Sequence, residues 1–284
     1  MKPRMIVFML VSLLAVSAAQ ARRRSLAEIS VDIKLDVHSY VSGERVRGVV
    51  DVKNMSPDRI SVGYPDSRDK LVVEVFRSND ATQLDRLDKS RPFVSPFSLK
   101  SNEGQKLEVF LGDNYDLKEA RNYRARVVLV HDGYRYEGPY RTFSVVPGIH
   151  IVSAKQVFSK ERNKNRHFDV LRETRNGVEH IFLSAFDKWE DGRIETLGTT
   201  DLGAMLRITK PTISILDGGE VIIIHRNGAD SFVRSEFWSM PGLLHLRSRI
   251  SVGDPATAGQ ARVQELYKRE GGVKPIERPW WKFW

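Results

Sequence analysis

The sequence contains no cysteine in its 284 residues. This absence excludes disulfide bonds, thiol catalysis and cysteine-ligated metal sites, so burial of apolar side chains must stabilise the fold. Two enzyme motifs are missing as well. No pair of histidines has the His-Glu-x-x-His spacing of zinc peptidases, and no segment has the Gly-x-Ser-x-Gly pattern that carries a nucleophilic serine. We therefore expect no catalytic residues, no cofactor and no bound metal.

Long hydrophobic runs are also missing, except for one at the N-terminus. A short basic start precedes an apolar run over residues 6–16 and the small-x-small site Ala19-Gln20-Ala21. The run is too short to cross a bilayer, and the three-part pattern is typical of a secretory signal peptide over residues 1–21. The sequence thus predicts an exported protein, periplasmic or extracellular, that can associate with a membrane surface.

Basic residues outnumber acidic ones, 45 to 36, which gives a formal charge of +9. Loss of Lys2 and Arg4 with the signal peptide would lower that charge by two, to +7. An exported basic protein suits an envelope protein, an anionic glycan or a membrane surface as partner, although such a mild excess can also serve solubility alone. The basic stretch over 160–167 has no interleaved aromatic residue, so we expect no nucleic-acid binding. No pattern specifies an oligomeric state.

Residues 28–146 contain short alternating segments separated by turn formers. In the clearest one, Tyr123, Ala125 and Val127 fall on one face and Arg124 on the other, as in a half-buried strand. A tyrosine at the start of such a strand can bond back to the preceding loop and fix a corner. Strands of this domain are expected over 30–37, 46–54, 60–63, 71–76, 107–111, 123–129 and 134–145. About seven strands without a helix predict an immunoglobulin-like antiparallel sandwich.

Two stretches of this domain resemble known sandwich modules. The pattern Tyr40, Gly43-Glu44, Val46, Val50, Val52 and Asn54 resembles the second-strand motif of bacterial intracellular proteinase inhibitor domains and macroglobulin-type modules. The run Phe97-Ser98-Leu99, Glu103-Gly104, Leu107, Tyr115-Asp116-Leu117, Tyr123 and Ala125 is similar to the sandwich that precedes the catalytic domain of secreted deuterolysin-type metallopeptidases. Those modules have glycine before the strand tyrosine, where this chain has Ala120-Arg121-Asn122. The resemblance implies a secreted sandwich module, and the missing zinc motif removes the implied peptidase.

Residues 149–253 predict a second domain, an antiparallel β-meander. Its alternating segments are separated by Asn-Gly and Asp-Gly pairs, which are the strongest short-range signals for hairpins. Either one curved sheet or a small sandwich fits this pattern. Asp254 and Pro255 then begin the one expected helix, over 254–270, with Val263, Leu266 and Tyr267 as its inner stripe.

The C-terminal tail, residues 271–284, is the least ordinary feature. Its predicted binding residues are aromatic or basic: Arg278, Trp280, Trp281, Lys282, Phe283 and Trp284. Tryptophan beside cations is typical of a membrane interface, and tryptophan also anchors protein interfaces. The alternative is that the tail packs back on its own domain.

Two other sets of polar residues are candidates for a functional role, an acidic cluster and two histidines. Asp187, Glu190 and Asp191 cluster before a glycine turn but do not match a calcium loop, so a solvated acidic turn is favoured. His225 and His245 follow or interrupt apolar segments, so we expect structural, hydrogen-bonded histidines.

The sequence as a whole predicts an exported, non-catalytic binding or structural protein of the bacterial envelope. Two alternatives stay open. One is a proteinase inhibitor of the sandwich type that would use an exposed loop over 78–97. The other is a hydrolase whose carboxylate pair lies in the second domain, since such pairs are recognised only in three dimensions.

Overall fold

The computed structural model describes residues 29–157, 163–240 and 243–253. The chain divides into two compact units between Pro147 and Gly148. Every regular element in the described ranges is a strand, apart from one 3-10 turn at Leu111–Asp113, so the predicted all-β class is confirmed. The signal peptide, the helix over 254–270 and the tail over 271–284 lie outside the described residues. No helix in the described part of the chain is long and apolar enough to span a membrane.

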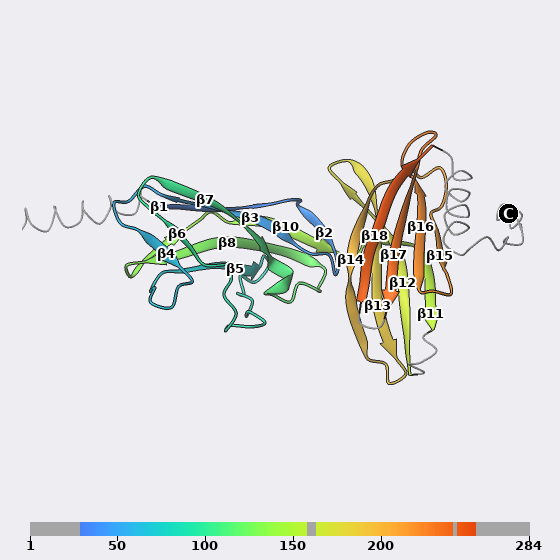
Figure 1. Cartoon of the computed structure of the whole chain (residues 1–284), viewed down its shortest axis with the longest axis horizontal. Coiled ribbons are helices and arrows are strands. Elements are labelled where there is room, and N and C mark those ends of the chain that lie inside the picture. The colour runs from blue at the N-terminus through green and yellow to red at the C-terminus, as the bar shows by residue number, and fades with distance from the viewer. Residues whose placement is uncertain (1–28, 158–162, 241–242, 254–284) are drawn as a thin grey trace, which may run out of the picture. The chain divides into compact units, whose positions relative to one another are not determined.

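The described residues of unit 1, 29–147, form ten strands in three sheets (Figure 1). The strands are β1 (Ile29–Leu35), β2 (Ser39–Val41), β3 (Arg47–Asn54), β4 (Ile60–Val62), β5 (Lys70–Arg77), β6 (Phe97–Leu99), β7 (Glu103–Phe110), β8 (Arg121–His131), β9 (Tyr134–Glu137) and β10 (Arg141–Val146). One sheet has the order β1-β3-β7, a second has the order β2-β10-β8-β5 with β9 also paired to β8, and β4 pairs with β6. Adjacent strands are antiparallel except β2 and β10.

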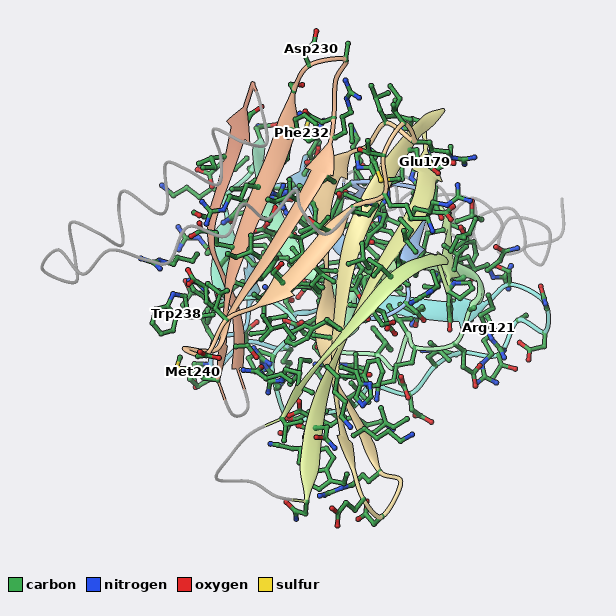
Figure 2. The ribbon with its side chains drawn as sticks, turned by 90° about the vertical axis from the view of Figure 1, so that its right-hand side faces the viewer. Arg121, Glu179, Asp230, Phe232, Trp238 and Met240 are labelled. Atoms are coloured by element: carbon green, nitrogen blue, oxygen red, sulfur yellow. The ribbon has the colours of Figure 1, made fainter. Side chains whose placement is uncertain are left out.

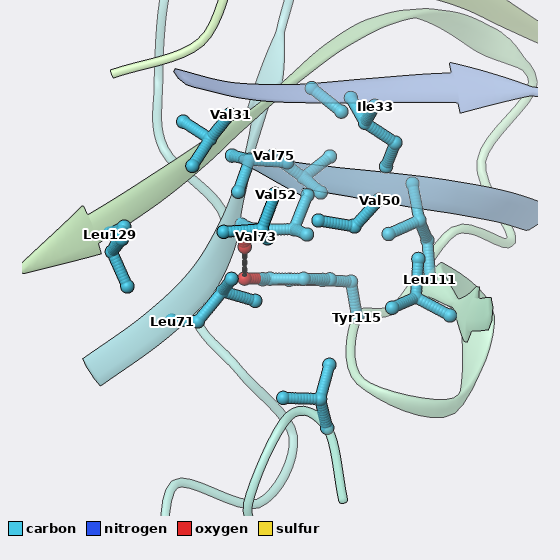
Figure 3. Packing of buried hydrophobic residues seen from close by; sticks show 14 of the residues in the cluster. Val31, Ile33, Val50, Val52, Leu71, Val73, Val75, Leu111, Tyr115 and Leu129 are labelled. Carbon is cyan, nitrogen blue, oxygen red and sulfur yellow. Dashed lines mark hydrogen bonds between the residues drawn. The ribbon is translucent and has the colours of Figure 1, made fainter. Parts of the chain in front are cut away.

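The core of unit 1 forms where the alternating apolar faces of its sheets meet (Figure 3). Tyr115, 3% exposed, lies among these side chains and its hydroxyl donates to the carbonyl oxygen of Val73. Burial raises the pKa of Tyr115 to about 12, which keeps the phenol protonated as a donor. The Tyr123 hydroxyl donates to the carbonyl oxygen of Glu119 at 3.0 Å, which is the corner expected from the sequence. This packing is consistent with a β-sandwich.

The segment predicted as one closing strand over 134–145 is instead two strands, β9 and β10. Gly138 lies in the interruption, where a Cβ atom would come within 2.5 Å of the Val31 carbonyl oxygen. Close approach of the backbone to β1 therefore breaks the strand, and only glycine fits at this position.

In the part of unit 2 that the structure describes, eight strands form two four-stranded sheets. They are β11 (Ile149–Val157), β12 (Lys164–Arg175), β13 (Val178–Trp189), β14 (Ile194–Ala204), β15 (Thr212–Ile215), β16 (Glu220–Arg226), β17 (Phe232–Met240) and β18 (Leu243–Val252). Each sheet is an antiparallel meander in chain order, β11 to β14 and β15 to β18. Phe168 and Ile181 from the first sheet share one core with Val221, Ile223 and Phe237 from the second. Of the two architectures that fit the sequence, unit 2 is the small sandwich.

The hairpin predicted at Asn176-Gly177 in unit 2 is confirmed. Asn176 and Gly177 both have positive φ, 49° and 79°, as the two-residue turn between β12 and β13 requires. Strand β17 crosses its sheet between β16 and β18, with Phe232 toward one end and Trp238 and Met240 toward the other (Figure 2). No strand was predicted at β11, an edge strand whose residues are all exposed or half-buried.

Candidate functional site

The predicted binding residues Arg278, Trp280, Trp281, Lys282, Phe283 and Trp284 lie outside the described residues. The candidate site therefore comes from unit 1, on the outer face of the sheet β2-β10-β8-β5. Strand β8 turns Tyr123 and Ala125 into the core and Arg124 and Arg126 outward. We call Phe76, Arg124, Arg126 and Tyr140 the arginine-aromatic face.

Arg124 lies between two aromatic rings. Its guanidinium carbon is 4.7 Å from the ring centre of Tyr140 and 5.5 Å from that of Phe76. The two rings meet edge to face, with centres 5.7 Å apart. Strand register explains this arrangement, because Phe76 on β5 and Thr142 on β10 lie directly opposite Arg124. A cation over an aromatic face is attracted by the ring quadrupole, so the rings hold the guanidinium in place.

Arg124 makes no ion pair and no side-chain hydrogen bond with any residue in the described ranges, and its Nε atom is buried without a partner. Its neighbour Arg126 differs. The Nε atom of Arg126 donates to Glu74 at 2.9 Å, and another nitrogen of the same guanidinium contacts Glu137. Arg126 is therefore neutralised and Arg124 is not.

The acidic groups near this face are already engaged. Glu74 also pairs with Arg135 at 2.7 Å, and hydrogen bonding from Arg135 holds the pKa of Glu137 below its usual range. Three arginines face two glutamates here, which leaves one positive charge, at Arg124. Glu137 therefore stays ionised at neutral pH, and neither glutamate is available to Arg124.

Such an arrangement can bind an oxyanion. A guanidinium is planar and pairs with carboxylate, sulfate or phosphate through two parallel hydrogen bonds. Tyr140 is 41% exposed and offers a ring surface beside that cation. Thr142 is exposed opposite Arg124 on β10 and adds a hydroxyl at the same face. The face thus combines a charged donor, a neutral donor and an aromatic surface.

The sequence shows that Arg124 points outward but not that it lacks a partner. Phe76 and Tyr140 are 48 and 16 residues from it, so only the strand register brings the three together. The one sequence feature that could have indicated this face is an alternating strand with arginine at two successive outward positions.

The carboxylate of Asp187 is engaged by two cationic side chains. Asp187, 1% exposed, accepts from Arg166 at 2.7 Å and 3.0 Å and lies 3.3 Å from Lys164 Nζ. Burial opposes its ionisation, but the hydrogen bonds and charges of Arg166 and Lys164 outweigh that cost and lower its pKa. The prediction of a solvated turn is therefore wrong for Asp187, because its side chain points into the sandwich. It is right for Glu190 and Asp191, which are exposed.

The two histidines that the sequence singled out, His225 and His245, differ from each other. His225 is 2% exposed, as expected for a structural histidine, and the backbone of Ala204 is its polar neighbour. Burial lowers the pKa of His225 to about 4, so the ring is neutral at neutral pH. His245 is exposed on β18, because it lies opposite Trp238 on the outer face of the sheet.

The loop proposed for proteinase inhibition is anchored at several points. Leu84 and Phe93 pack against the core of unit 1, and Val94 is buried. Arg86 donates to the carbonyl oxygen of Arg91 at 2.5 Å. These contacts hold the loop over 78–96 against its own unit, and none of them favours inhibition.

Comparisons with known proteins place the chain in no family. No protein-family model matches it, and no curated protein sequence matches it. Among solved structures, the chain is similar to Spo0M, a sporulation control protein from Bacillus subtilis, over 86% of this chain and 97% of that chain, with 10% sequence identity and a TM-score of 0.28. A likeness this distant supports no conclusion about function.

Proposed function

We propose that the chain is an exported, non-catalytic binding protein of the bacterial envelope, and that its immunoglobulin-like unit 1 binds an anionic glycan at the arginine-aromatic face. The observation that carries the proposal is the unpaired guanidinium of Arg124 between the rings of Phe76 and Tyr140. The signal-peptide pattern supports the proposed location of the protein in the envelope, and the positive net charge of the sequence supports a negatively charged ligand.

A glycan fits this face better than a phosphate alone. Sugar rings stack their apolar faces on exposed aromatic rings, while uronic acids carry a carboxylate that pairs with arginine. Tyr140 and Arg124 offer both contacts within 4.7 Å of each other. The remaining donor at this face, Thr142, suits a sugar hydroxyl.

The proposal is tested by measuring binding of the full chain to alginate, a polymer of uronic acids, with neutral dextran as reference. Arg124→Gln should weaken alginate binding by about tenfold, because hydrogen bonds to a charged group contribute about 1.5–3 kcal/mol. Arg59→Gln is the matched control. Arg59 is an exposed arginine of the same unit with no ion pair to any described residue, and its loss changes the net charge equally.

Two results would contradict the proposal. If both substitutions weaken binding equally, net charge and not the arginine-aromatic face holds the polymer. If the chain ignores alginate but binds phosphatidylglycerol vesicles through Arg124, the ligand is a lipid phosphate and the glycan is wrong.

The aromatic tail is a second contact in the same proposal, carried by its sequence alone. A chain that ends at Val273 should lose partitioning to envelope membranes, because tryptophan and lysine together favour the interface. Sedimentation with phosphatidylglycerol vesicles measures this. Unchanged partitioning with a lower melting temperature would show that the tail packs on its own unit instead.

A further inference from the structure

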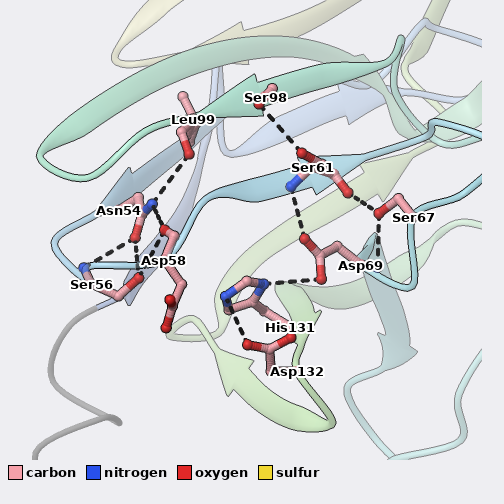
Figure 4. Close-up of polar contacts among 10 residues, drawn as sticks. All are labelled: Asn54, Ser56, Asp58, Ser61, Ser67, Asp69, Ser98, Leu99, His131 and Asp132. Carbon is pink, nitrogen blue, oxygen red and sulfur yellow. Dashed lines mark hydrogen bonds and ion pairs between the residues drawn. The ribbon is translucent and has the colours of Figure 1, made fainter.

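A second polar site lies at the far end of β8 and is separate from the arginine-aromatic face. His131 ends β8, is 6% exposed, and stands before the turn Asp132-Gly133 that leads to β9. Its Nδ1 atom lies 2.9 Å from Oδ1 of Asp69, which comes from the link between β4 and β5 (Figure 4). The strand end and the link bring together residues that are 62 positions apart.

Asp69 is held firmly in this position. Its Oδ2 atom accepts the backbone N–H of Ser61 at 2.7 Å, and its own N–H donates to the hydroxyl of Ser67 at 3.0 Å. An ionised carboxylate can only accept, so Nδ1 of His131 carries the proton in this contact. In the neutral ring, the lone pair then lies on Nε2.

Nε2 of His131 is buried and has no hydrogen-bond partner among the described residues. The nearest opposing group is Oδ2 of Asp132, at 3.7 Å. That separation is too long for a hydrogen bond. It does suit two ligands of one ion, because Zn²⁺ lies about 2.0–2.1 Å from imidazole nitrogen and about 2.0–2.2 Å from carboxylate oxygen, which gives an angle of roughly 125° at the metal.

We propose that His131 Nε2 and the Asp132 carboxylate bind a divalent transition-metal ion, with Zn²⁺ as the reference ion. Asp69 acts behind the histidine, where a carboxylate on the second ring nitrogen fixes the tautomer and raises the basicity of the ligand. One ligand atom from each of Asp69, His131 and Asp132 falls within 4.8 Å of the other two. Imidazole excludes Ca²⁺ and Mg²⁺, which take oxygen ligands.

With two direct protein ligands, the ion keeps open positions for water or for an oxygen of another molecule. Asp132 is the exposed side of the site, since its side chain is 69% exposed while that of His131 is 7% exposed. The ion therefore enters past Asp132, and the bound ion joins the β8–β9 turn to the strand end beneath it.

The backbone conformation of the turn allows a conservative substitution at Asp132. Asp132 has φ of 48° and Gly133 has φ of 77°, a two-residue turn in which asparagine is accepted as readily as aspartate. Asp132→Asn therefore keeps the turn and removes the ligand charge. His131→Gln removes the nitrogen ligand but changes a buried side chain, so the two variants are used together.

The experiment titrates Zn²⁺ into the full chain, prepared without a polyhistidine tag, against a chromophoric chelator. Wild type should bind one equivalent of Zn²⁺, and His131→Gln should bind none. Asp132→Asn should weaken binding at least tenfold, and Asp69→Asn by about 10–100-fold, the usual cost of losing the group behind a ligand. The matched control is His150→Gln, because His150 also lies near an aspartate, 3.8 Å from Asp169, but is 56% exposed.

A folded wild-type chain that binds no Zn²⁺ would overturn the site. So would binding that survives both His131→Gln and Asp132→Asn, or that is lost in His150→Gln. Circular dichroism of each variant separates loss of the metal ligand from loss of the fold, and Asp132→Asn decides the matter if His131→Gln unfolds.

Discussion

Arg124 of unit 1 and Arg166 of unit 2 both lie on inner strands of a sheet, yet their surroundings are opposite. Directly across from Arg166 on the next strand is Asp187, and Arg166 also donates to Ser239 Oγ at 3.0 Å. Directly across from Arg124 are Phe76 and Thr142, and no carboxylate in the described ranges reaches it. Arg166 is fully buried, whereas Arg124 is half-buried at the surface.

The cross-strand neighbour decides what each arginine does. A carboxylate opposite a buried guanidinium completes an internal ion pair, and here that pair joins the two sheets of unit 2 because Ser239 belongs to the other sheet. Aromatic rings hold a guanidinium in place without neutralising it. The first arrangement stabilises the fold, and the second keeps a charge available to a ligand.

The largest expected effect is on the buried pair of unit 2. Asp187→Asn should lower the free energy of unfolding by about 3–5 kcal/mol, because it leaves Arg166 charged and uncompensated in the interior. Urea denaturation followed by tryptophan fluorescence measures the change. Arg124→Gln in unit 1 should change stability by no more than about 0.5 kcal/mol, as surface substitutions do. Circular dichroism measures this change, because unit 1 contains no tryptophan.

The control for that prediction removes both charges. Arg166→Met combined with Asp187→Leu should recover much of the lost stability, because the charge of the fully buried Arg166 is removed together with that of Asp187, and only Lys164 loses its contact with the carboxylate. A double variant as unstable as Asp187→Asn alone would show that packing, and not charge, causes the loss.

A second prediction concerns how the stability of the fold changes at acidic pH, and it depends on His225, a residue of unit 2. The pKa of His225 is lowered from 6.5 to about 4 by burial, so the unfolded chain binds more protons than the folded chain between these values. Stability should therefore fall as the pH drops from 6.5 to 4, by about 3 kcal/mol in total, and the loss from this group should end below that range. His225→Leu should remove this part of the pH dependence.

Denaturation midpoints at several pH values between 4 and 7 provide the measurement. His150→Leu is the control, because the side chain of His150 is 56% exposed. If His225→Leu keeps the full acid dependence, another group of the chain is responsible for it.

Much of this fold could be predicted from sequence because its signals are local. Alternation located β8 and β3, and Asn-Gly and Asp-Gly pairs located the hairpins of unit 2. Strand β11 had a weaker signal, because its inward positions include Ala154 and Gln156, which are not large apolar residues. Gly138 was missed for a different reason: the chain it lies against, at Val31, is more than 100 residues away.

The sites depend almost entirely on long-range placement. Asp187 looked like part of an acidic turn, because nothing in its own segment reveals that Arg166 lies opposite it. In the same way, neither His131 nor Asp69 belongs to a spaced motif, and the pairing of Arg124 with Phe76 follows from register alone. A sequence shows which side chains carry a charge or a hydrogen-bonding group. It does not show which residue of another strand neutralises that charge or accepts that hydrogen bond.

The smallest expected effect on stability comes from making Arg124 resemble Arg166. Thr142→Glu places a carboxylate directly across from Arg124, and an opposite-charge pair on neighbouring strands contributes about 0.2–1 kcal/mol. The same substitution should abolish alginate binding although Arg124 is still present, since the new carboxylate occupies the guanidinium. Thr142→Gln is the matched control, because it has the same side-chain length as glutamate, carries no charge and still offers an amide donor in place of the threonine hydroxyl, so it should keep most of the binding. Equal loss of binding in both variants would mean that the unpaired state of Arg124 is not what the ligand recognises.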